Sequence, residues 1–362
     1  MTIVYSGDQP CNVKNFGAVG NGYAEDTNAI QNAINSLGSE GGVVYFPQGI
    51  YLTDTLYIPS NVTLFGYDKE STTLQLVNYP SGALLECSGT SSSDVHENIR
   101  VENLSLKHDV YYNKQNEQKG ILIRGYFTRY CSVYNCILYG CSVYGILLSQ
   151  IDANNTYARS WVISGNRFTN FTPTSKGIFL YDQAEYVMIK ENTFEEMGQA
   201  IQSDNSANCE IHDNTFLQCG DKASASPVIN ISGNSGSINS GKALIHDNQI
   251  NHSKYMPLRI YQGGSRNSQY GSIVHHNFIL IDEGFSNNPV AIYGMCGGII
   301  QDNHISSGSA NKVPCIYLSD AGNVTASDNN IHDNIFSWAG INTNNCSGSN
   351  NMHDNSVVQY EQ

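Results

Sequence analysis

The sequence is poor in charged side chains, and this scarcity excludes one large class of partners. Only 14% of the 362 residues are Asp, Glu, Lys or Arg, and the formal net charge is −14 because 32 acidic residues outnumber 18 basic ones. Contact with a nucleic-acid backbone needs clustered Lys and Arg. We therefore predict no nucleic-acid partner. A neutral substrate, or an acidic one met at a local basic patch, fits the composition better.

Long apolar segments are also missing. No stretch reaches the roughly 18 apolar residues of a membrane span. The N-terminal segment MTIVYSGDQPCNV has neither the basic start nor the apolar core of a secretory signal peptide. No linker separates two parts of the chain, while 40% of the residues are apolar and can build a large core. We predict no membrane partner and one folded domain over residues 1–362.

The ten cysteines form no CxxC pair, which argues against a zinc site. Cys131, Cys136 and Cys141 recur every five residues, and this spacing fits neither a metal site nor a simple disulfide framework. We therefore expect buried free thiols that pack as small apolar groups.

A short pattern recurs through the second half of the chain: an apolar residue, one or two polar residues, Asn, any residue, and another apolar residue. Examples are ISGNRF, IHDNTF and IQDNHI. The steps between its Asn residues run from 21 to 34 residues, as is typical of a solenoid. Strand-like alternation in GIFLYD and VINIS makes the solenoid a β-helix. The pattern's Asn residues are Asn166, Asn192, Asn214, Asn248, Asn277, Asn303, Asn334 and Asn355.

Equivalent positions of successive coils stack about 4.8 Å apart in such a sheet, so each Asn is expected to hydrogen-bond to the Asn above and below it. In four copies the Asn follows His-Asp, with His212, His246, His332 and His353. A metal site needs ligands that converge on one point, whereas stacked repeats spread them along a column. We predict no metal site and expect these histidines to be solvated or packed in loops. Metal binding by one pair is the alternative.

The segment DTNAIQNAINSL at residues 26–37 predicts an amphipathic helix. Asp26 or Thr27 is the expected N-cap, and apolar residues recur at helical spacing behind it. Residues 41–67 then predict short strands broken by Pro-Gln-Gly and Pro-Ser-Asn turns. A helix before the first coil would cap the open end of the stack, where an unpaired sheet edge would invite aggregation.

The opening of the chain, NVKNFGAVGNGYAEDTNAIQNAI followed by GGVVYFPQGIY, resembles the pectate-lyase-like superfamily of right-handed parallel β-helices. The superfamily includes phage tailspike depolymerases, mannuronan C5-epimerases, glycoside hydrolases and polysaccharide lyases. The resemblance implies an all-β, single-stranded right-handed parallel β-helix, with an N-terminal cap and first coils at 12–76 and Asn-ladder coils at 77–362. It also implies a polysaccharide substrate, an extracellular or virion-associated location and a homotrimer, without naming the reaction.

Two carboxylates are the first candidates for catalysis. Asp182 and Asp204 each lie ten residues before an Asn of the repeat, so we expect them in one column on adjacent coils. They would then lie roughly 5 Å apart, as the acid and nucleophile of retaining glycosidases do, and one pKa would be raised. Glu185 is a reserve candidate. In the alternative interpretation both Asp merely end strands, and Asp320 in CIYLSDAG supports it.

A groove for sugars is expected beside these carboxylates. Tyr181, Tyr261, Tyr293 and Tyr317 fall at similar places in successive strands, and a file of Tyr would stack on sugar faces. Arg124 and Arg259 are charges inside otherwise apolar strands, which is costly unless they point outward or pair. An outward Arg would hold a uronate. Gln150 completes the predicted groove.

A lyase or C5-epimerase is the second hypothesis. Such an enzyme neutralises a uronate carboxylate, removes the C5 proton with Lys, Arg, Tyr or His, and often uses Ca²⁺. Lys176, Arg124 or a Tyr could supply the base. Mannuronan epimerases carry Asp-Pro-His in a middle coil, but the corresponding stretch here, SVYGILLSQIDANN, has neither Pro nor His. We therefore predict first a glycoside hydrolase without a cofactor, second a lyase or epimerase, and third a glycan-binding β-helix without catalysis.

Overall fold

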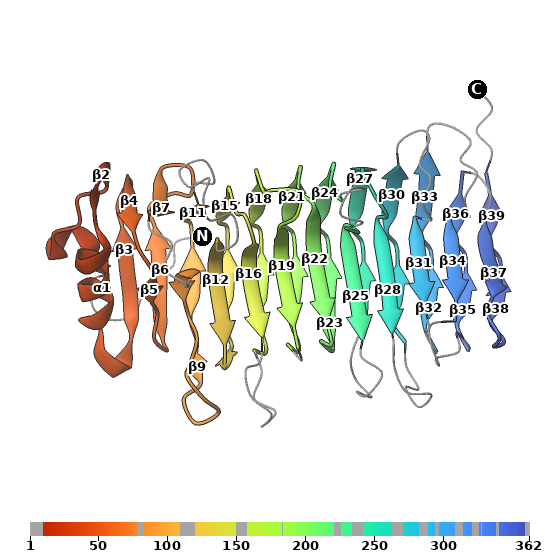
Figure 1. Ribbon diagram of the computed structural model, residues 1–362, viewed down its shortest axis with the longest axis horizontal. Coiled ribbons are helices and arrows are strands. Elements are labelled where there is room, and N and C mark those ends of the chain that lie inside the picture. Colours follow the sequence, from red (N-terminus) through yellow and green to blue (C-terminus); the bar gives the residue numbers. More distant parts are fainter. Residues whose placement is uncertain are drawn as a thin grey trace.

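The chain folds into a right-handed parallel β-helix, seen in the computed structural model of Figure 1. Three long sheets run side by side along the axis, and an N-terminal helix stands before them. The structure describes residues 10–77, 83–108, 120–149, 158–182, 184–220, 226–233, 242–262, 271–281, 289–293, 297–307, 314–320, 326, 328–337 and 340–358.

The strands fall into three sheets that we name A, B and C. Sheet A contains β1 (Cys11–Asn12), β3 (Gly42–Phe46), β6 (Val62–Gly66), β10 (Arg100–Glu102), β14 (Ser132–Tyr134), β17 (Val162–Ser164), β20 (Met188–Lys190), β23 (Cys209–His212), β26 (Ala243–His246), β29 (Ile273–His275), β32 (Ile299–Gln301), β35 (Asn330–His332) and β38 (Asn351–His353).

Sheet B contains β2 (Asn21–Glu25), β4 (Gly49–Thr53), β7 (Thr72–Leu76), β11 (Ser105–His108), β15 (Ile137–Tyr139), β18 (Arg167–Thr169), β21 (Thr193–Glu195), β24 (Thr215–Leu217), β27 (Gln249–Ser253), β30 (Phe278–Ile281), β33 (His304–Ser307), β36 (Ile335–Phe336) and β39 (Ser356–Val357).

Sheet C contains β5 (Leu56–Tyr57), β8 (Ala83–Glu86), β12 (Ile121–Tyr126), β16 (Tyr144–Ser149), β19 (Lys176–Tyr181), β22 (Gln199–Asp204), β25 (Ile229–Gly233), β28 (Leu258–Gln262), β31 (Val290–Tyr293), β34 (Ile316–Ser319) and β37 (Ile341–Asn345). A two-stranded sheet pairs β9 (His96–Glu97) with β13 (Thr128–Arg129). The helical segments are η1 (Val13–Phe16), α1 (Thr27–Asn35) and η2 (Gly38–Glu40).

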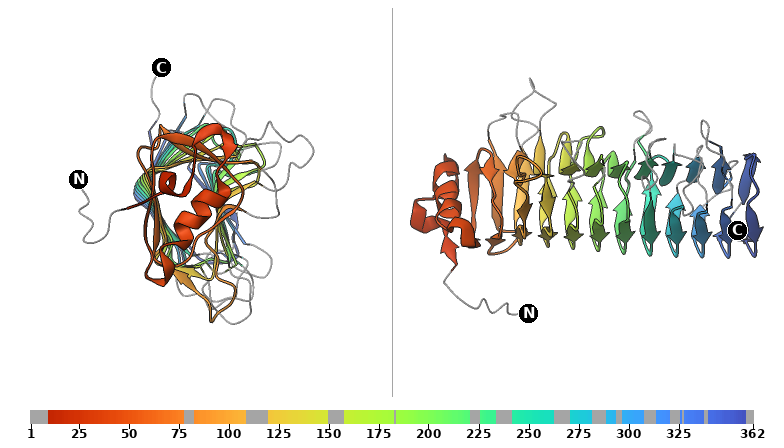
Figure 2. Two further views of the ribbon diagram at one scale, coloured as in Figure 1. Left: turned by 90° about the vertical axis from the view of Figure 1, so that its left-hand side faces the viewer. Right: turned by 90° about the horizontal axis from the view of Figure 1, so that it is seen from below.

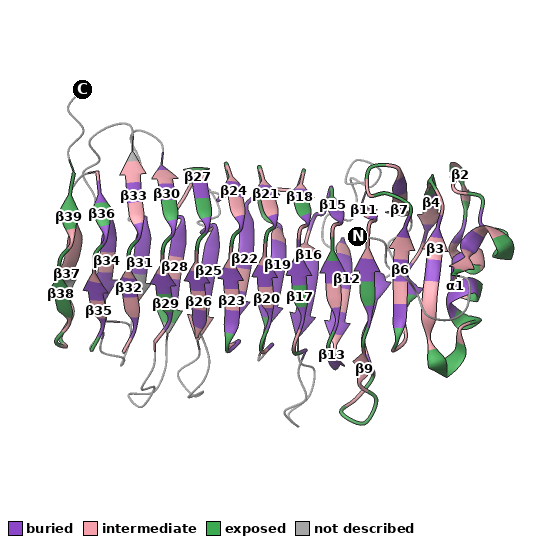
Figure 3. Ribbon diagram, turned by 180° about the vertical axis from the view of Figure 1, so that it is seen from behind, coloured by how far each residue is buried: buried purple, intermediate pink, exposed green. Residues whose placement is uncertain are grey.

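The core lies inside the coils and is built by alternation along each strand. In β6, Val62 and Leu64 are buried while Thr63 between them is only partly covered, because successive side chains point to opposite faces. Figure 3 shows buried residues recurring in all three sheets along the stack. Equivalent positions stack on one another, so the rings of Phe168, Phe194 and Phe216 lie with centroids 4.5 and 4.9 Å apart.

The repeated Asn forms the predicted ladder in the turn between sheets A and B. Asn214 is buried, and its Nδ2 donates to Asn248 Oδ1 at 3.0 Å and to the Ile189 carbonyl at 2.8 Å. Its Oδ1 accepts from Asn192 Nδ2 at 3.0 Å. The same side-chain bond links each ladder Asn from Asn166 to Asn355 to the next. Each buried amide is therefore satisfied by its neighbours along the column.

The predicted cap helix is present as α1, across the end of the stack in the left view of Figure 2. Ile30, Ala33 and Ile34 are buried, as the apolar stripe predicted. Asp26 is the N-cap residue, as predicted, but its side chain makes no hydrogen bond to the helix. Its carboxylate instead accepts from the backbone N–H groups of Val19 and Gly20, at 2.5 and 2.9 Å, and so holds the preceding loop.

The three regularly spaced cysteines are free and buried, as predicted. They flank the short strands β14 and β15, so their spacing of five residues is that of the coil corners. Burial raises the pKa of each thiol to about 12. These groups therefore act as small core residues. Within the described ranges, no helix has both the length and the apolar character needed to cross a membrane.

The Asn ladder yields a stability prediction. Replacing Asn214 with Leu leaves polar groups of Asn192 and Asn248 buried without their partner, so we expect a loss of about 3 to 5 kcal/mol in the free energy of unfolding. Chemical denaturation followed by circular dichroism measures it. The matched control is Asn355→Leu, at the partly exposed end of the same ladder, with an expected loss of about 1 kcal/mol. Equal losses at both positions would contradict the buried-ladder explanation.

Candidate functional site

The outer surface of sheet C, which we call face C, presents two columns of side chains in its middle coils. Inward positions such as Ile178 and Leu180 in β19 are fully buried. The first outward column contains Arg124, Leu147, Phe179, Gln202, Asn230 and Arg259. The second contains Tyr126, Ser149, Tyr181, Asp204, Ser232 and Tyr261.

A lysine lies among aromatic rings on this face. The Nζ of Lys176 is 5.0 Å from the ring centroid of Phe179 and 5.3 Å from that of Tyr144. The Phe179 ring in turn lies 5.1 Å from Tyr144 and 5.3 Å from Tyr181. Asp204 lies beside Tyr181, since the two residues are partners in the sheet register. We call Tyr144, Lys176, Phe179, Tyr181 and Asp204 the lysine cluster. The cluster combines an amine, two phenols and a carboxylate.

The charges of the lysine cluster influence one another. Burial lowers the pKa of Lys176, and the negative charge of Asp204 offsets this in part. The pKa of Tyr144 is raised by burial and then by the charges of Asp204 and Tyr181. Asp204 is held in place because its carboxylate accepts from Gln202 Nε2 at 2.5 Å and from the Ser232 hydroxyl. The amine of Lys176 is therefore more easily deprotonated than an exposed lysine.

The predicted pairing of Asp182 with Asp204 in one column is wrong. The register places Tyr181 opposite Asp204, and Asp182 follows one residue later. Residues at equal distances before the ladder Asn are partners in the structure only as far back as the turn before sheet A. Glu185 and Ala207, for example, both precede their Asn by seven residues and pair with each other. Three residues lie between Tyr181 and Glu185, but only two lie between Asp204 and Ala207. The extra residue in that turn shifts Asp182 out of the column.

Asp182 ends its strand in a left-handed backbone conformation, with φ of 49°, and its N–H donates to the Asp204 carbonyl at 2.9 Å. Asp320 makes the equivalent backbone bond to Asn345 at 3.0 Å. The pKa of Asp320 is lowered because its carboxylate accepts from the Ser347 hydroxyl and from the N–H groups of Ala326 and Ser347. The strand-end interpretation therefore describes Asp320 well and matches the position of Asp182.

One further predicted residue, Glu185, lies away from face C. Glu185 is in the turn between sheets C and A, where its backbone pairs with Arg159 and Ala207. Its pKa is raised by burial, against the opposing charge of Arg159. Gln150 lies outside the described residues.

The two predicted arginines do share one column, but they are five strands apart, or about 24 Å. Arg124 is paired with Glu86, through Nε at 2.7 Å and a second contact through its terminal nitrogen. Burial lowers the pKa of Arg124, but the bond to Glu86 raises it more, so the net direction is upward. Arg259 donates from Nε to Asn230 Oδ1 at 2.9 Å. Among the described residues Arg259 has no carboxylate partner, whereas Arg124 is paired with Glu86.

The predicted file of tyrosines is partly correct. Tyr181, Tyr261 and Tyr293 share the second column of face C, with Asp204 and Ser232 between the first two. The rings of Tyr261 and Tyr293 lie 6.2 Å apart. Tyr317 belongs to the first column instead, opposite Ala291.

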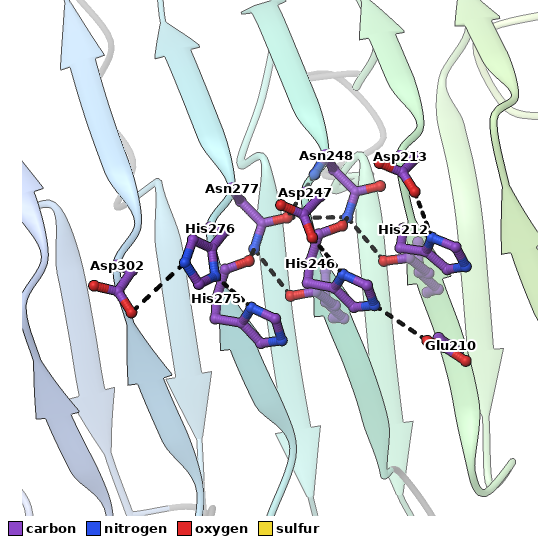
Figure 4. Close-up of polar contacts among 12 residues, drawn as sticks. Glu210, His212, Asp213, His246, Asp247, Asn248, His275, His276, Asn277 and Asp302 are labelled. Carbon is purple, nitrogen blue, oxygen red and sulfur yellow. Dashed lines mark hydrogen bonds and ion pairs between the residues drawn. The ribbon is translucent and has the colours of Figure 1, made fainter.

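Away from face C, the His-Asp-Asn repeats form a separate column of polar side chains at the end of sheet A (Figure 4). His212, His246 and His275 stack with ring centroids 4.8 Å apart, one per coil as predicted. The Nδ1 of His212 and of His246 each contacts the carboxylate of the following Asp at 2.7 Å. His275 and its neighbour His276 belong to VHHNFI, another copy of the same repeat, and are not among the four histidines considered from the sequence.

Among the described residues, one group of three meets the spacing expected for metal ligands. Single ligand atoms of His246, Asp247 and His275 all lie within 4.8 Å of one another.

A family comparison now identifies the class of protein. A family described as rhamnogalacturonase A/epimerase, pectate lyase-like, matches residues 11–224, which is more than half of the chain. The chain belongs to this family. Its members act on polysaccharides, and the resemblance predicted from the opening residues is confirmed.

Individual relatives resemble parts of the chain or its fold. Mannuronan C5-epimerase AlgE1 of Azotobacter vinelandii is 34% identical over 120 residues, covering 28% of this chain and 9% of the epimerase. The chain thus matches about a tenth of that relative's length. The AlgE4 A-module of the same organism has a TM-score of 0.72 at 18% identity, covering 96% of this chain and 95% of the module. The surface adhesin PfbA of Streptococcus pneumoniae has a TM-score of 0.55 at 16% identity, covering 97% of this chain and 99% of the adhesin chain. The two structural likenesses show the fold.

The Arg124–Glu86 pair predicts a stabilising role and no part in substrate binding. We expect Arg124→Met to lower the free energy of unfolding by about 2 to 3 kcal/mol, because the carboxylate of Glu86 is only 9% exposed and loses its partner. The control Arg167→Met breaks a more exposed pair with Glu195 and should cost less than about 1 kcal/mol. Denaturation of both variants measures the difference. A raised KM with unchanged stability in Arg124→Met would refute the assignment.

Proposed function

We propose that the chain removes the C5 proton of a uronate residue in an acidic polysaccharide bound along face C, as a lyase or an epimerase does. The observation that supports this most directly is the packing of the Lys176 amine against the rings of Tyr144 and Phe179, with its pKa lowered by burial. A neutral lysine amine is a competent base for a carbon acid.

The other members of the lysine cluster have roles that follow from their positions. Tyr181 is 47% exposed beside Asp204 and would deliver a proton, either to the departing sugar oxygen or to the opposite side of C5. Asp204 adjusts the pKa of Lys176 and fixes Gln202. Arg259 lies two strands from Asp204 on the same face, about 10 Å away, and would pair with the carboxylate of a neighbouring uronate. Tyr261 beyond it would stack on a sugar ring.

Relatives support this chemistry. The AlgE1 and AlgE4 proteins are named as mannuronan C5-epimerases, and the family description includes an epimerase. Because residues 142–155 contain no His, a lysine or tyrosine base replaces an imidazole in the proposal. Ca²⁺ prefers six to eight oxygen ligands, and Asp204 is the one carboxylate of the lysine cluster. The cluster does not fit that ion, so no step is assigned to it.

Hydrolysis is a second candidate, supported by a different observation. The backbone bond from Asp182 to Asp204 keeps two carboxylate residues next to each other at the edge of face C, despite their offset register. In this reaction Asp204 would act with Asp182, or with Glu185 as the reserve, on a glycosidic bond. The family description also names a rhamnogalacturonase. Glycan binding without catalysis, by the exposed Tyr181 and Tyr261, is the third candidate. The adhesin PfbA, which has a similar fold, is the relative that suggests it.

The extracellular or virion-associated location and the homotrimer stay predictions. An extended acidic polysaccharide is a material of cell surfaces, and PfbA is described as a surface protein. Light scattering of the purified chain determines the oligomeric state.

The proposed base is tested by Lys176→Gln. We expect kcat on a polyuronate to fall roughly 100-fold or more, because glutamine keeps a polar side chain at this position but has no basic nitrogen. The matched control Lys107→Gln removes a lysine that also lies over a tyrosine ring, at 5.7 Å from Tyr139, but in sheet B, and should leave turnover unchanged. Ultraviolet absorbance detects an unsaturated uronate, and deuterium uptake at C5 in heavy water detects an epimerase. New reducing ends without either signal would establish hydrolysis instead.

The pH dependence of Asp204→Asn separates the two reactions. Activity that needs the neutral amine of Lys176 rises with pH through the pKa of that lysine. The Asp204 charge raises this pKa, so its removal lowers the pKa and moves the rise of kcat to lower pH, with activity retained. If Asp204 acts as an acid or nucleophile in hydrolysis, the same variant loses nearly all turnover at every pH. The pH profile of kcat decides between them.

A further inference from the structure

The Asp of the His-Asp-Asn repeat has a structural explanation in the backbone. The residue before each ladder Asn turns the chain from sheet A to sheet B in the left-handed region, with φ of 54° at Asp213, 53° at Asp247 and 54° at Asp302. Asp tolerates this conformation better than most residues. The carboxylate is then placed beside the His that precedes it, and no ligand is needed to account for the motif.

Three coils lack this Asp: Gly165 and Glu191 occupy the turn position in the coils of β17 and β20, and a histidine occupies it in the coil of β29. In the coil of β29 the turn position is His276, with φ of 52°, so His275 has no carboxylate as its sequence neighbour. Its Nδ1 instead lies 2.7 Å from the Nδ1 of His276. A hydrogen bond between two ring nitrogens needs one N–H and one lone pair. At least one Nδ1 of this pair is therefore unprotonated, and it could bind a metal ion in place of the N–H that it now accepts from.

The preceding coil brings the complementary donors to the same point (Figure 4). His246 stacks on His275 with ring centroids 4.8 Å apart, and Asp247 contacts the Nδ1 of His246. One ligand atom from each of His246, Asp247 and His275 lies within 4.8 Å of the others. On its far side, His246 Nε2 is 3.1 Å from Glu210. A carboxylate on the second nitrogen is the usual partner of a histidine that ligates a metal through the first.

We propose that His246, Asp247 and His275 bind a divalent transition-metal ion of the zinc class, with His276 available as a fourth ligand. Two or three imidazoles and one carboxylate match the tetrahedral nitrogen and oxygen set of such ions. Ligand atoms about 2.1 Å from an ion lie roughly 3.4 Å from one another. Small rotations of Asp247 and His276 close the remaining gap, because both side chains are exposed.

The charges around the site set its pH dependence. Burial lowers the pKa of His246, but hydrogen bonds to Asp247 and Glu210 raise it by more. Burial and the neighbouring His246 and His276 lower the pKa of His275, while the charges of Asp247 and Asp302 raise it. The ring of His212 stacks on the other side of His246, and Asp302 also lies 3.9 Å from the Nε2 of His276. Metal binding needs unprotonated imidazoles, so the affinity for the ion is expected to fall at acidic pH.

The same ladder contains a matched control. His332 and His353 stack with centroids 4.9 Å apart, and the Nδ1 of each contacts its own Asp, at 2.6 and 2.7 Å. No His stands at the turn position of these coils, which carry Asp333 and Asp354. In this pair each stacked histidine has its own Asp, and no second histidine stands at the turn. The pair therefore resembles the proposed site but lacks its full set of ligands.

Titration calorimetry with ZnCl₂, on the whole chain freed of any affinity tag and stripped of metal, tests the site. We expect one equivalent to bind, with affinity reduced at least tenfold in His246→Ala and in His275→Ala, and unchanged in His332→Ala. His276→Asp restores the repeat, so it should keep the melting temperature while weakening zinc binding severalfold. Circular dichroism confirms that each variant is folded. Absence of saturable binding, or an equal loss in His332→Ala, overturns the proposal.

Discussion

Backbone pairing between successive coils is the interaction on which the rest of this structure depends. Each strand of sheets A, B and C is hydrogen-bonded in parallel to the equivalent strand of the next coil. Parallel pairing without a register shift forces equivalent residues to lie one above another, about 4.8 Å apart. The Phe stack inside, the Asn ladder in the turn and the His column outside all follow from this one constraint. Their common spacing is that of the backbone.

The constraint also limits which chemistry each surface can hold. Like charges in adjacent coils would repel, and on face C the neighbours of Asp204 in its column are Tyr181 and Ser232. A single carboxylate among phenols and a lysine is the reason why we propose proton transfer at carbon ahead of hydrolysis by a carboxylate pair. In sheet A, stacked imidazoles are compatible because they are neutral or are paired with Asp and Glu.

The sequence predicted the repeating parts of the molecule well, because each repeated feature has a local cause. The Asn spacing revealed the ladder, the apolar stripe revealed α1, and the absence of CxxC pairs left the cysteines to the core. The site was predicted less well because it depends on register across sheet C. Counting back from the Asn passes through a turn of variable length, so Asp182 was placed where Tyr181 lies. The pairing of Arg124 with Glu86 joins residues 38 positions apart, and no sequence period indicates it.

In a solenoid, a residue that recurs in every coil is explained by the fold, so the exceptions to the repeat are the residues that need another explanation. Asp before the ladder Asn recurs because the turn needs a left-handed residue, and His276 is an exception at that position. Asp204 is likewise the one carboxylate in the second column of face C from Tyr126 to Tyr261. Lys176 stands in register between Tyr144 and Gln199, and its charge is half-buried among rings. Departures from a local rule are expected chiefly at functional sites, which is why the proposed catalytic and metal sites are placed on these residues.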